Sequence, residues 1–274
     1  MTATPVLEVT PQPTPLRTLL SDLWRSRALM SMLARRDFFV RYRRASFGLA
    51  WAIVIPLTQA LILAVVLSRV TRIKTPGVSF TVFLLSGTVV WTFFSAAVSA
   101  STTAIVDGAG MSTKIYFPRA VLPLVNVIGG LYGLGLNIVV LLVLTPIFGS
   151  WPGWQVLLLI PAVALTTLLA ATFGLVLSAL QVYFRDVRYL LDAATRAWFY
   201  VTPIFYPLTI LHGLRTWVEA NPVTGVVELF RAGTVGADPG WLTSLWWTLG
   251  WVGCLGAIAL VLHRKYDRLF TDLM

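Results

Sequence analysis

The amino-acid sequence predicts an all-α polytopic membrane protein with six transmembrane helices, an N-terminal amphipathic interface helix and re-entrant short helices before the last span. Apolar residues make up 57% of the 274 residues and charged residues only 12%, whereas a soluble domain is about 45–50% apolar and about 25% charged. The mean hydropathy is +0.81. Several stretches without any charge are long enough to cross a bilayer core, which takes roughly 20 apolar residues of helix. Lipid is therefore the expected solvent for most of the chain.

The N-terminal part of the chain is basic and is expected to stay in the cytoplasm. Residues 1–25 begin with a run rich in proline and threonine and are predicted to be a disordered tail. Residues 26–46 interleave apolar and basic side chains, which predicts an amphipathic helix in the cytoplasmic membrane interface. A positively charged flank without that role is the alternative. The residues assigned to the interface helix are Arg35, Arg36, Asp37, Arg41, Tyr42, Arg43 and Arg44.

Residues 47–262 are predicted to form the six-span transmembrane domain, followed by a cytoplasmic tail over 263–274. The first span is expected at 47–68 and the second within 75–106. The uncharged stretch 120–184 holds the third and fourth spans, with a turn at 145–153 where prolines and glycines interrupt the helix. The fifth is expected at about 197–208, extended upstream to Tyr189, and the sixth at 241–262. Residues 209–240 are too short for two crossings and are expected to enter the outer leaflet as short helices.

The distribution of basic residues predicts the orientation. With six spans, the segments on the side of the termini carry 16 Lys and Arg residues and the opposite loops carry 5. The positive-inside rule then places both termini in the cytoplasm, although Arg69, Arg72 and Lys74 in the first loop oppose the trend. The net charge of +10 is thus a topology signal, and no nucleic-acid partner is expected.

The sequence lacks the residues that bind ATP. A phosphate-binding loop needs glycines ahead of its lysine, and no lysine of this chain has them. No cofactor is therefore expected on this chain, and ATP and Mg are expected on a partner subunit. Paired carboxylates, or a nucleophile beside its base, are also missing, so the chain is not expected to be an enzyme.

Metal and ion chemistry are disfavoured too. The single cysteine, Cys254, excludes a cysteine-based zinc site, and His212 and His263 lie far apart in the sequence. Ion-coupled carriers usually need a charged group within the membrane, and the predicted spans contain almost none. The acids near helix ends, such as Asp186 and Glu228, are expected to cap helices or form salt bridges.

Aromatic residues recur at helical spacing in two predicted spans. The second span has Phe80, Phe83, Gly87, Trp91 and Phe94, and the fifth has Trp198, Thr202 and Phe205. Two roles are open: contact with lipid or other helices, or the wall of a conduit on which sugar rings stack. Gly87 is expected to allow close approach of another group. The residues assigned to the substrate path are Trp51, Phe83, Trp91, Phe94, Trp198, Phe205 and Tyr206.

Four stretches resemble the permease subunit of type-2 ABC exporters, in the branch that exports polysaccharides and polyol phosphates. The first is RDFFVRYRRASFGLAW at 36–51, with Phe47 where that family usually has leucine. The second is KIYFPR at 114–119. The third is Arg185-Asp186 together with TPIFYP at 202–207, and the fourth is Asn221-Pro222 with Arg231. Their order and their placement against six spans carry the resemblance.

The resemblance implies a homodimer of this chain, paired with two copies of an ABC ATPase. The complex would move a lipid-linked polysaccharide, of O-antigen, teichoic acid or cell-wall galactan type, to the outer face of a bacterial inner membrane. It also implies that residues 114–119 dock on the ATPase, a positive-inside turn being the alternative. The residues assigned to ATPase coupling are Lys114, Ile115, Tyr116, Phe117, Pro118, Arg119, Arg185 and Asp186. Two other functions remain open: a type-2 ABC permease for drugs or small hydrophobic molecules, and a membrane scaffold or enzyme of envelope glycan synthesis.

Overall fold

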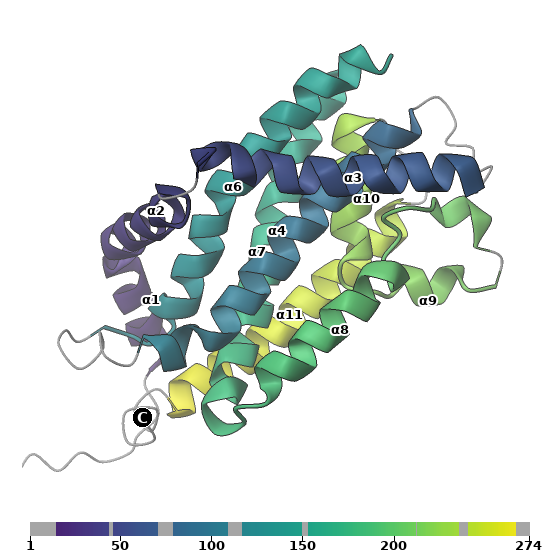
Figure 1. Cartoon of the computed structure of the whole chain (residues 1–274). Coiled ribbons are helices and arrows are strands. Elements are labelled where there is room, and N and C mark those ends of the chain that lie inside the picture. The colour runs from purple at the N-terminus through teal and green to yellow at the C-terminus, as the bar shows by residue number, and fades with distance from the viewer. Residues whose placement is uncertain are drawn as a thin grey trace, which may run out of the picture.

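The structure, a computed structural model, describes residues 15–43, 46–70, 79–108, 117–149, 153–211, 213–235 and 241–266. Every secondary-structure element in these residues is a helix, which confirms the predicted fold class. Long helices form a bundle, with α3 lying across one side of it and two shorter helices beside it at the N-terminal end (Figure 1). No membrane is present, so the spans are identified by length and composition.

Five helical segments in the described part of the chain are long and apolar enough to cross a membrane. They correspond to α3 (Trp51–Val70, preceded by η1, Gly48–Ala50), α4 (Phe80–Asp107), α6 (Val121–Ile147), α7 (Leu159–Tyr183, preceded by η2, Trp154–Leu158) and α11 (Trp241–Tyr266). These match the predicted spans one to four and six. The turn after α6 contains Gly149 at a φ of 80°, a conformation that glycine adopts without steric cost.

The predicted fifth span differs from the structure. Helix α8 runs from Val187 to Val201, so it begins earlier and ends earlier than expected. Its 15 residues extend about 22 Å, which is shorter than a bilayer core about 30 Å thick. The helix ends because Pro203 disfavours the helical conformation in the preceding residue, and Thr202 is accordingly extended, with a ψ of 137°.

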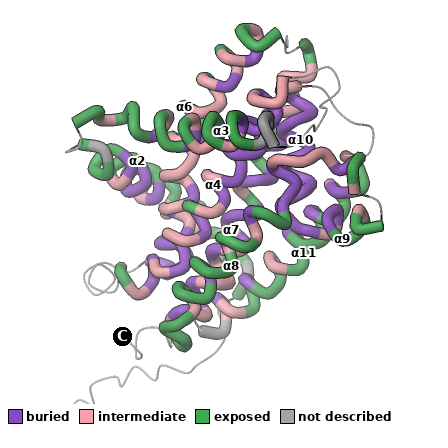
Figure 2. The backbone as a smooth tube through the Cα atoms, turned by 45° about the vertical axis from the view of Figure 1, so that its right-hand side comes forward, coloured by how far each residue is buried: buried purple, intermediate pink, exposed green. Residues whose placement is uncertain are grey.

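Short helices follow α8, as expected from the sequence. They are η3 (Leu208–Ile210), α9 (Arg215–Glu219) and α10 (Thr224–Thr234). All eleven residues of α10 are buried, and this helix contacts α4, α7 and α11. Figure 2 shows α10 and the adjacent part of α4 as the most buried region, whereas α3 and α8 are largely exposed.

The N-terminal region is more ordered than the sequence suggested. Residues 16–25, expected within a disordered tail, form α1 (Leu16–Arg25), because leucines at 16, 19, 20 and 23 recur at helical spacing. Helix α2 (Arg27–Arg43) covers most of the predicted interface helix. It buries Leu33 and Ala34 and packs against α6.

The basic residues assigned to the interface helix lie mainly on the solvent side of α2. Arg35, Arg36, Arg41 and Arg43 are exposed, and Arg36 pairs with the half-buried Asp37 at 2.9 Å. The backbone of Tyr42 belongs to α2, and Arg44 lies outside the described residues. The lipid contact of this helix stays a prediction.

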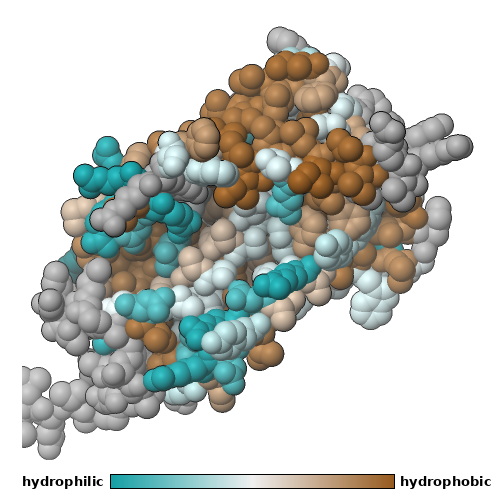
Figure 3. Space-filling model, viewed as in Figure 1, coloured by the Kyte–Doolittle hydropathy of each residue, from teal (hydrophilic) through white to brown (hydrophobic). Residues whose placement is uncertain are grey.

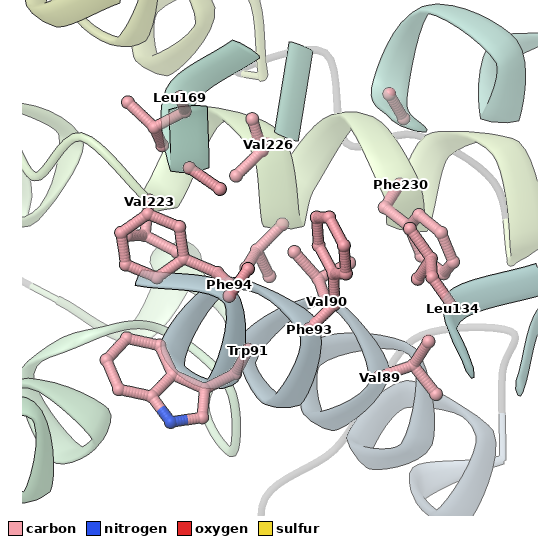
Figure 4. Packing of buried hydrophobic residues seen from close by; sticks show 14 of the residues in the cluster. Val89, Val90, Trp91, Phe93, Phe94, Leu134, Leu169, Val223, Val226 and Phe230 are labelled. Atoms are coloured by element: carbon pink, nitrogen blue, oxygen red, sulfur yellow. The ribbon is translucent and has the colours of Figure 1, made fainter. Parts of the chain in front are cut away.

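The core is centred on α4. Its valine, phenylalanine and tryptophan side chains meet those of α6, α7 and α10 (Figure 4). Helices α4 and α7 approach closely at Gly174 of α7, where an added Cβ would lie 2.6 Å from Cβ of Ser101. Amide side chains also tie the helices together: Asn126 Nδ2 donates to the carbonyl of Ala100 at 3.1 Å and Asn137 Nδ2 to that of Ala52 at 3.0 Å. Small residues and such interhelical bonds are the usual basis of helix association in lipid.

Candidate functional site: the broken end of α8 and its groove

The break after α8 is held on one side by Asn221. Its Oδ1 accepts a hydrogen bond from Trp198 Nε1 at 2.9 Å and another from the Val223 backbone N–H at 3.0 Å. Its Nδ2 donates to Thr202 Oγ1 at 3.1 Å. A single buried amide therefore connects the last turn of α8, the break itself and the turn that precedes α10.

Arg231 of α10 holds the other side of the break. Its Nη1 donates to the carbonyl of Pro203 and its Nη2 to that of Ile204, both at 2.6 Å. The guanidinium pairs with Glu228 at 2.8 Å, and it lies 3.6 Å from the ring centroid of Phe83. The arginine side chain is 3% exposed, so a charge is buried here with an acid, two carbonyls and an aromatic face around it.

The sequence singles out three residues of this network, Asn221, Glu228 and Arg231, but does not predict that they hold the end of α8. Asn221 and Arg231 belong to the fourth resembling stretch. For Glu228 the sequence left a helix cap and a salt bridge open, and the structure shows the salt bridge. An acid and an arginine three residues apart within an apolar stretch were the available signal, because that spacing places both on one helix face. Only the structure brings them to the end of α8.

An open groove lies between α3 and α8. It has a volume of about 540 Å³ and is lined by Trp51, Val54, Ile55, Thr58, Gln59, Ile62, Leu63, Phe199 and Tyr200. The groove combines aromatic rings with an amide and a hydroxyl group. Trp51, assigned to the substrate path from the sequence, lines it and is partly exposed.

The outward face of α8 continues this groove as a polar stripe. We define the α8 stripe as Tyr189, Asp192, Arg196 and Tyr200, which recur at helical spacing and are all exposed. Asp192 Oδ1 lies 3.5 Å from Ser99 Oγ of α4. Figure 3 shows hydrophilic residues gathered along α8, whereas the surface over α3 is hydrophobic.

The aromatic stripe predicted on the second span does not form an exposed wall in the subunit. Phe83, Trp91 and Phe94 are 8%, 6% and 0% exposed. The Trp91 ring lies 6.0 Å from those of Phe94 and Trp198 and 5.8 Å from that of Phe199. Helical spacing correctly placed the three residues on one face, but α8 and α10 cover that face.

The remaining residues assigned to the path lie around the break. Trp198 is half-buried between α4 and α7, with its ring 5.6 Å from Phe94 and 5.5 Å from Phe173. Phe205 and Tyr206 are half-buried, with ring centroids 5.1 Å apart. The Tyr206 hydroxyl donates to the carbonyl of Val201 at 2.7 Å, so the segment after the break folds back onto α8.

The coupling residues are divided between two segments. Phe117, Pro118 and Arg119 are buried at the start of α6, whereas Lys114, Ile115 and Tyr116 lie outside the described residues. Arg185 and Asp186 are exposed in the turn between α7 and α8. That turn is fixed by Gln181, whose Nε2 donates to the carbonyl of Arg185 at 3.0 Å.

Within the described residues, no group of three or more His, Cys, Asp or Glu side chains could hold a metal ion. His263 is buried in α11, with Nε2 3.1 Å from the carbonyl oxygen of Leu175 in α7. Cys254 is exposed on the same helix.

The chain was compared with known proteins. Residues 28–235 match the family described as ABC-2 type transporter. The chain belongs to this family. ABC-2 transporter relatives include two proteins named O-antigen export system permease protein RfbA. One, from Myxococcus xanthus, is 31% identical over 78% of this chain and 83% of its own length; the other, from Klebsiella pneumoniae, is 28% identical over 90% and 95%.

A more distant ABC-2 relative is the polysialic acid transport protein KpsM of Escherichia coli. It is 25% identical over 76% of this chain and 80% of its own length. Within the matched residues 28–235 lie most of α2, the break after α8, and α10. The helices α3, α4, α6, α7 and α8 lie there too. The family thus covers both the groove and the Arg231 network, and it identifies the chain as a transport permease subunit.

Proposed function

We propose that this chain is the membrane-spanning subunit of an ATP-driven exporter that moves a lipid-linked polysaccharide from the cytoplasm to the outer face of the inner membrane. The names of the relatives support the substrate class, since they are described as O-antigen export and polysialic acid transport proteins. The observation that carries the proposal is the α8 stripe, because a polar helix face in a membrane protein needs an aqueous surrounding.

If α8 runs along the membrane normal with its first residues at the cytoplasmic surface, the helix geometry gives the depth of this stripe. Arg196 lies ten residues after Asp186, which is about 15 Å along a helix axis, or half of a bilayer core about 30 Å thick. A charged side chain facing lipid at that depth costs about 2.5–3.5 kcal/mol or more. The exposed Arg196 and Asp192 therefore favour a water-filled path on this side of α8.

A second copy of the chain would enclose that path. Helix α3 also exposes apolar side chains that do not line the groove, including Leu61, Val65 and Val66. A homodimer that joins these surfaces around a two-fold axis would bury the apolar part and leave the stripe facing the central space. Such a space between two grooves is wider than either groove alone, as a polymer requires.

The chemistry of the path favours a glycan over a small hydrophobic cargo. Tyr189, Tyr200 and Trp51 offer aromatic faces for sugar rings, and Gln59 and Thr58 offer hydrogen bonds to hydroxyl groups. The groove itself is lined mostly by apolar side chains, so the distinction between the cargoes rests on the α8 stripe. The charged groups of Asp192 and Arg196 can hydrogen-bond to hydroxyl groups of a glycan, whereas an apolar drug gains nothing from them.

Two copies of an ABC ATPase would bind ATP and Mg and dock on the cytoplasmic side. Phe117, Pro118 and Arg119, with residues 114–116, form the proposed contact, because they lie between α4 and α6 in the sequence. Arg185 and Asp186 form a second contact at the start of α8. Both termini are proposed to be cytoplasmic, in agreement with the charge distribution.

The path is tested by labelling cysteines with a water-soluble thiol reagent in vesicles that contain the permease and its ATPase. In a Cys254→Ser background, Tyr200→Cys should react, whereas Val143→Cys on α6 should not. The two positions are comparably exposed in the subunit, at 64% and 58%, so only the surrounding medium separates them. Reaction at position 143 with none at 200 would contradict the proposed path.

Transport is tested in the same vesicles with a lipid-linked glycan and with an apolar dye as competing cargo. ATP-dependent delivery of the glycan supports the proposal. Delivery of the dye alone would favour the small-molecule alternative.

A further inference from the structure

We propose that Arg231 is a positioning residue that connects the outer end of α4 to the broken end of α8, and so couples movement of α4 to the Phe205–Tyr206 segment. This inference rests on the proposed export function. Arg231 neither lines the groove between α3 and α8 nor belongs to the α8 stripe. It acts through the backbone that it holds.

The two carbonyl groups that Arg231 binds have no helical partner. Since α8 ends at Val201, the carbonyls of Pro203 and Ile204 lie beyond the helix, where each unsatisfied polar group in a membrane is costly. One guanidinium satisfies both at once. A planar fork of donors can do this, whereas a lysine ammonium cannot match the same geometry.

Helix α4 contacts the same guanidinium through Phe83 and Gly87. The ring of Phe83 lies against it, and Gly87, one turn further along, leaves room for it. A Cβ added at Gly87 would be 2.9 Å from Arg231 Nη2 and 3.2 Å from Cα of Ile204. The prediction that Gly87 admits another group closely is thus confirmed, and the group is the Arg231 network.

This arrangement gives α4 two ends with different contacts. Its last residue, Asp107, leads through residues 108–116 to the proposed ATPase contact. Phe83 and Gly87, in its first turns, lie against Arg231. A displacement of α4 would therefore move the guanidinium relative to the carbonyls of Pro203 and Ile204. The position of the next two residues, Phe205 and Tyr206, would change with those hydrogen bonds.

The proposal is tested with Arg231→Lys in the complex with its ATPase, reconstituted in vesicles with lipid-linked glycan. The measured quantity is glycan exported per ATP hydrolysed. A variant that merely folds less well loses both activities in proportion, so this ratio stays constant. We expect the ratio to fall about tenfold, the size expected for losing a hydrogen bond to a charged group.

Thr234→Val on α10 is the matched control. Thr234 is buried on the same helix, and within the described part of the chain its hydroxyl bonds to carbonyls of α10, those of Phe230 and Arg231. This variant should keep the wild-type ratio. Export by Arg231→Lys at the wild-type ratio would overturn the proposal.

If Arg231→Lys does not assemble, Phe83→Leu decides the question. It removes the aromatic face against the guanidinium while keeping an apolar side chain, and a smaller fall in the same ratio is expected. A wild-type ratio in an assembled Phe83→Leu complex would equally overturn the proposal.

A readout without transport separates this inference from the proposed function. In a Cys254→Ser background, Tyr206→Cys should react faster with a water-soluble thiol reagent when Arg231 is replaced by lysine. Equal labelling rates with and without that replacement would refute the positioning role, even if the complex exports no glycan. If the rates differ while the wild-type complex exports no glycan, the positioning role holds and the proposed function fails.

Discussion

Replacing Trp91 with alanine should destabilise the subunit, and the size of the effect follows from its surroundings. The side chain is 6% exposed and its ring lies within 6.0 Å of three others. Deleting a buried tryptophan in a soluble core costs about 3–5 kcal/mol. Because lipid is as apolar as the core, the transfer part of this cost is small and lost packing dominates, so we expect the lower end, about 3 kcal/mol.

The assay is thermal unfolding of the purified complex in detergent. For a chain of this size, 1 kcal/mol corresponds to about 2–4 °C in Tm, so Trp91→Ala should lower Tm by about 6–12 °C. Trp246→Ala is the matched control, since it removes the same side chain from an α11 position that is 71% exposed, and it should leave Tm nearly unchanged.

Tyr200→Ala completes the comparison. Its exposed ring has edge contacts with Phe199 at 5.3 Å and Phe205 at 6.0 Å, and its loss should cost about 1 kcal/mol while lowering export. A Trp91→Ala protein that melts with the wild type but fails to export would refute this reasoning and restore the conduit role of the α4 stripe.

Four further outcomes are expected. The purified chain alone should hydrolyse no ATP, and turnover above background without a partner ATPase would contradict this. Reporter fusions at Met274 and at Trp154 should lie on opposite sides of the membrane, with Met274 in the cytoplasm; activity of the Met274 fusion outside the cell would reverse the topology. Replacing Tyr116 and Phe117 together with alanine should lower stimulated ATP hydrolysis and export while insertion persists, and normal export by the inserted variant would exclude coupling there. Gly174→Ala should reduce the yield of folded subunit by separating α4 from α7, whereas Gly250→Ala, with open space around its Cβ, should not.

In the network around the break, the sequence predicts the end of a helix but not the hydrogen-bond partners of Arg231. The sequence marked Thr202-Pro203 as part of a motif, and Pro203 alone is sufficient to stop a helix. The predicted helix over 197–208 was nevertheless wrong, because the apolar composition of this segment suggests a continuous span whereas Pro203 ends the helix at Val201. Glu228 and Arg231 were visible as a helical pair, but no pattern states which carbonyls a buried arginine will reach.

The sequence by itself predicted lipid as the solvent and placed five long apolar helices in the right order, because hydrophobic length and charge distribution act locally along the chain. The further span that it predicted is the shorter helix α8 in the structure. The sequence also determined that Phe83, Trp91 and Phe94 share one face of α4. Only the tertiary structure decided what covers that face. Helices α8 and α10 pack over it, so these rings form core, whereas the aromatic and charged residues of the α8 stripe are exposed. Periodicity assigns residues to a face of a helix, whereas the neighbour of that face depends on contacts between segments more than 100 residues apart.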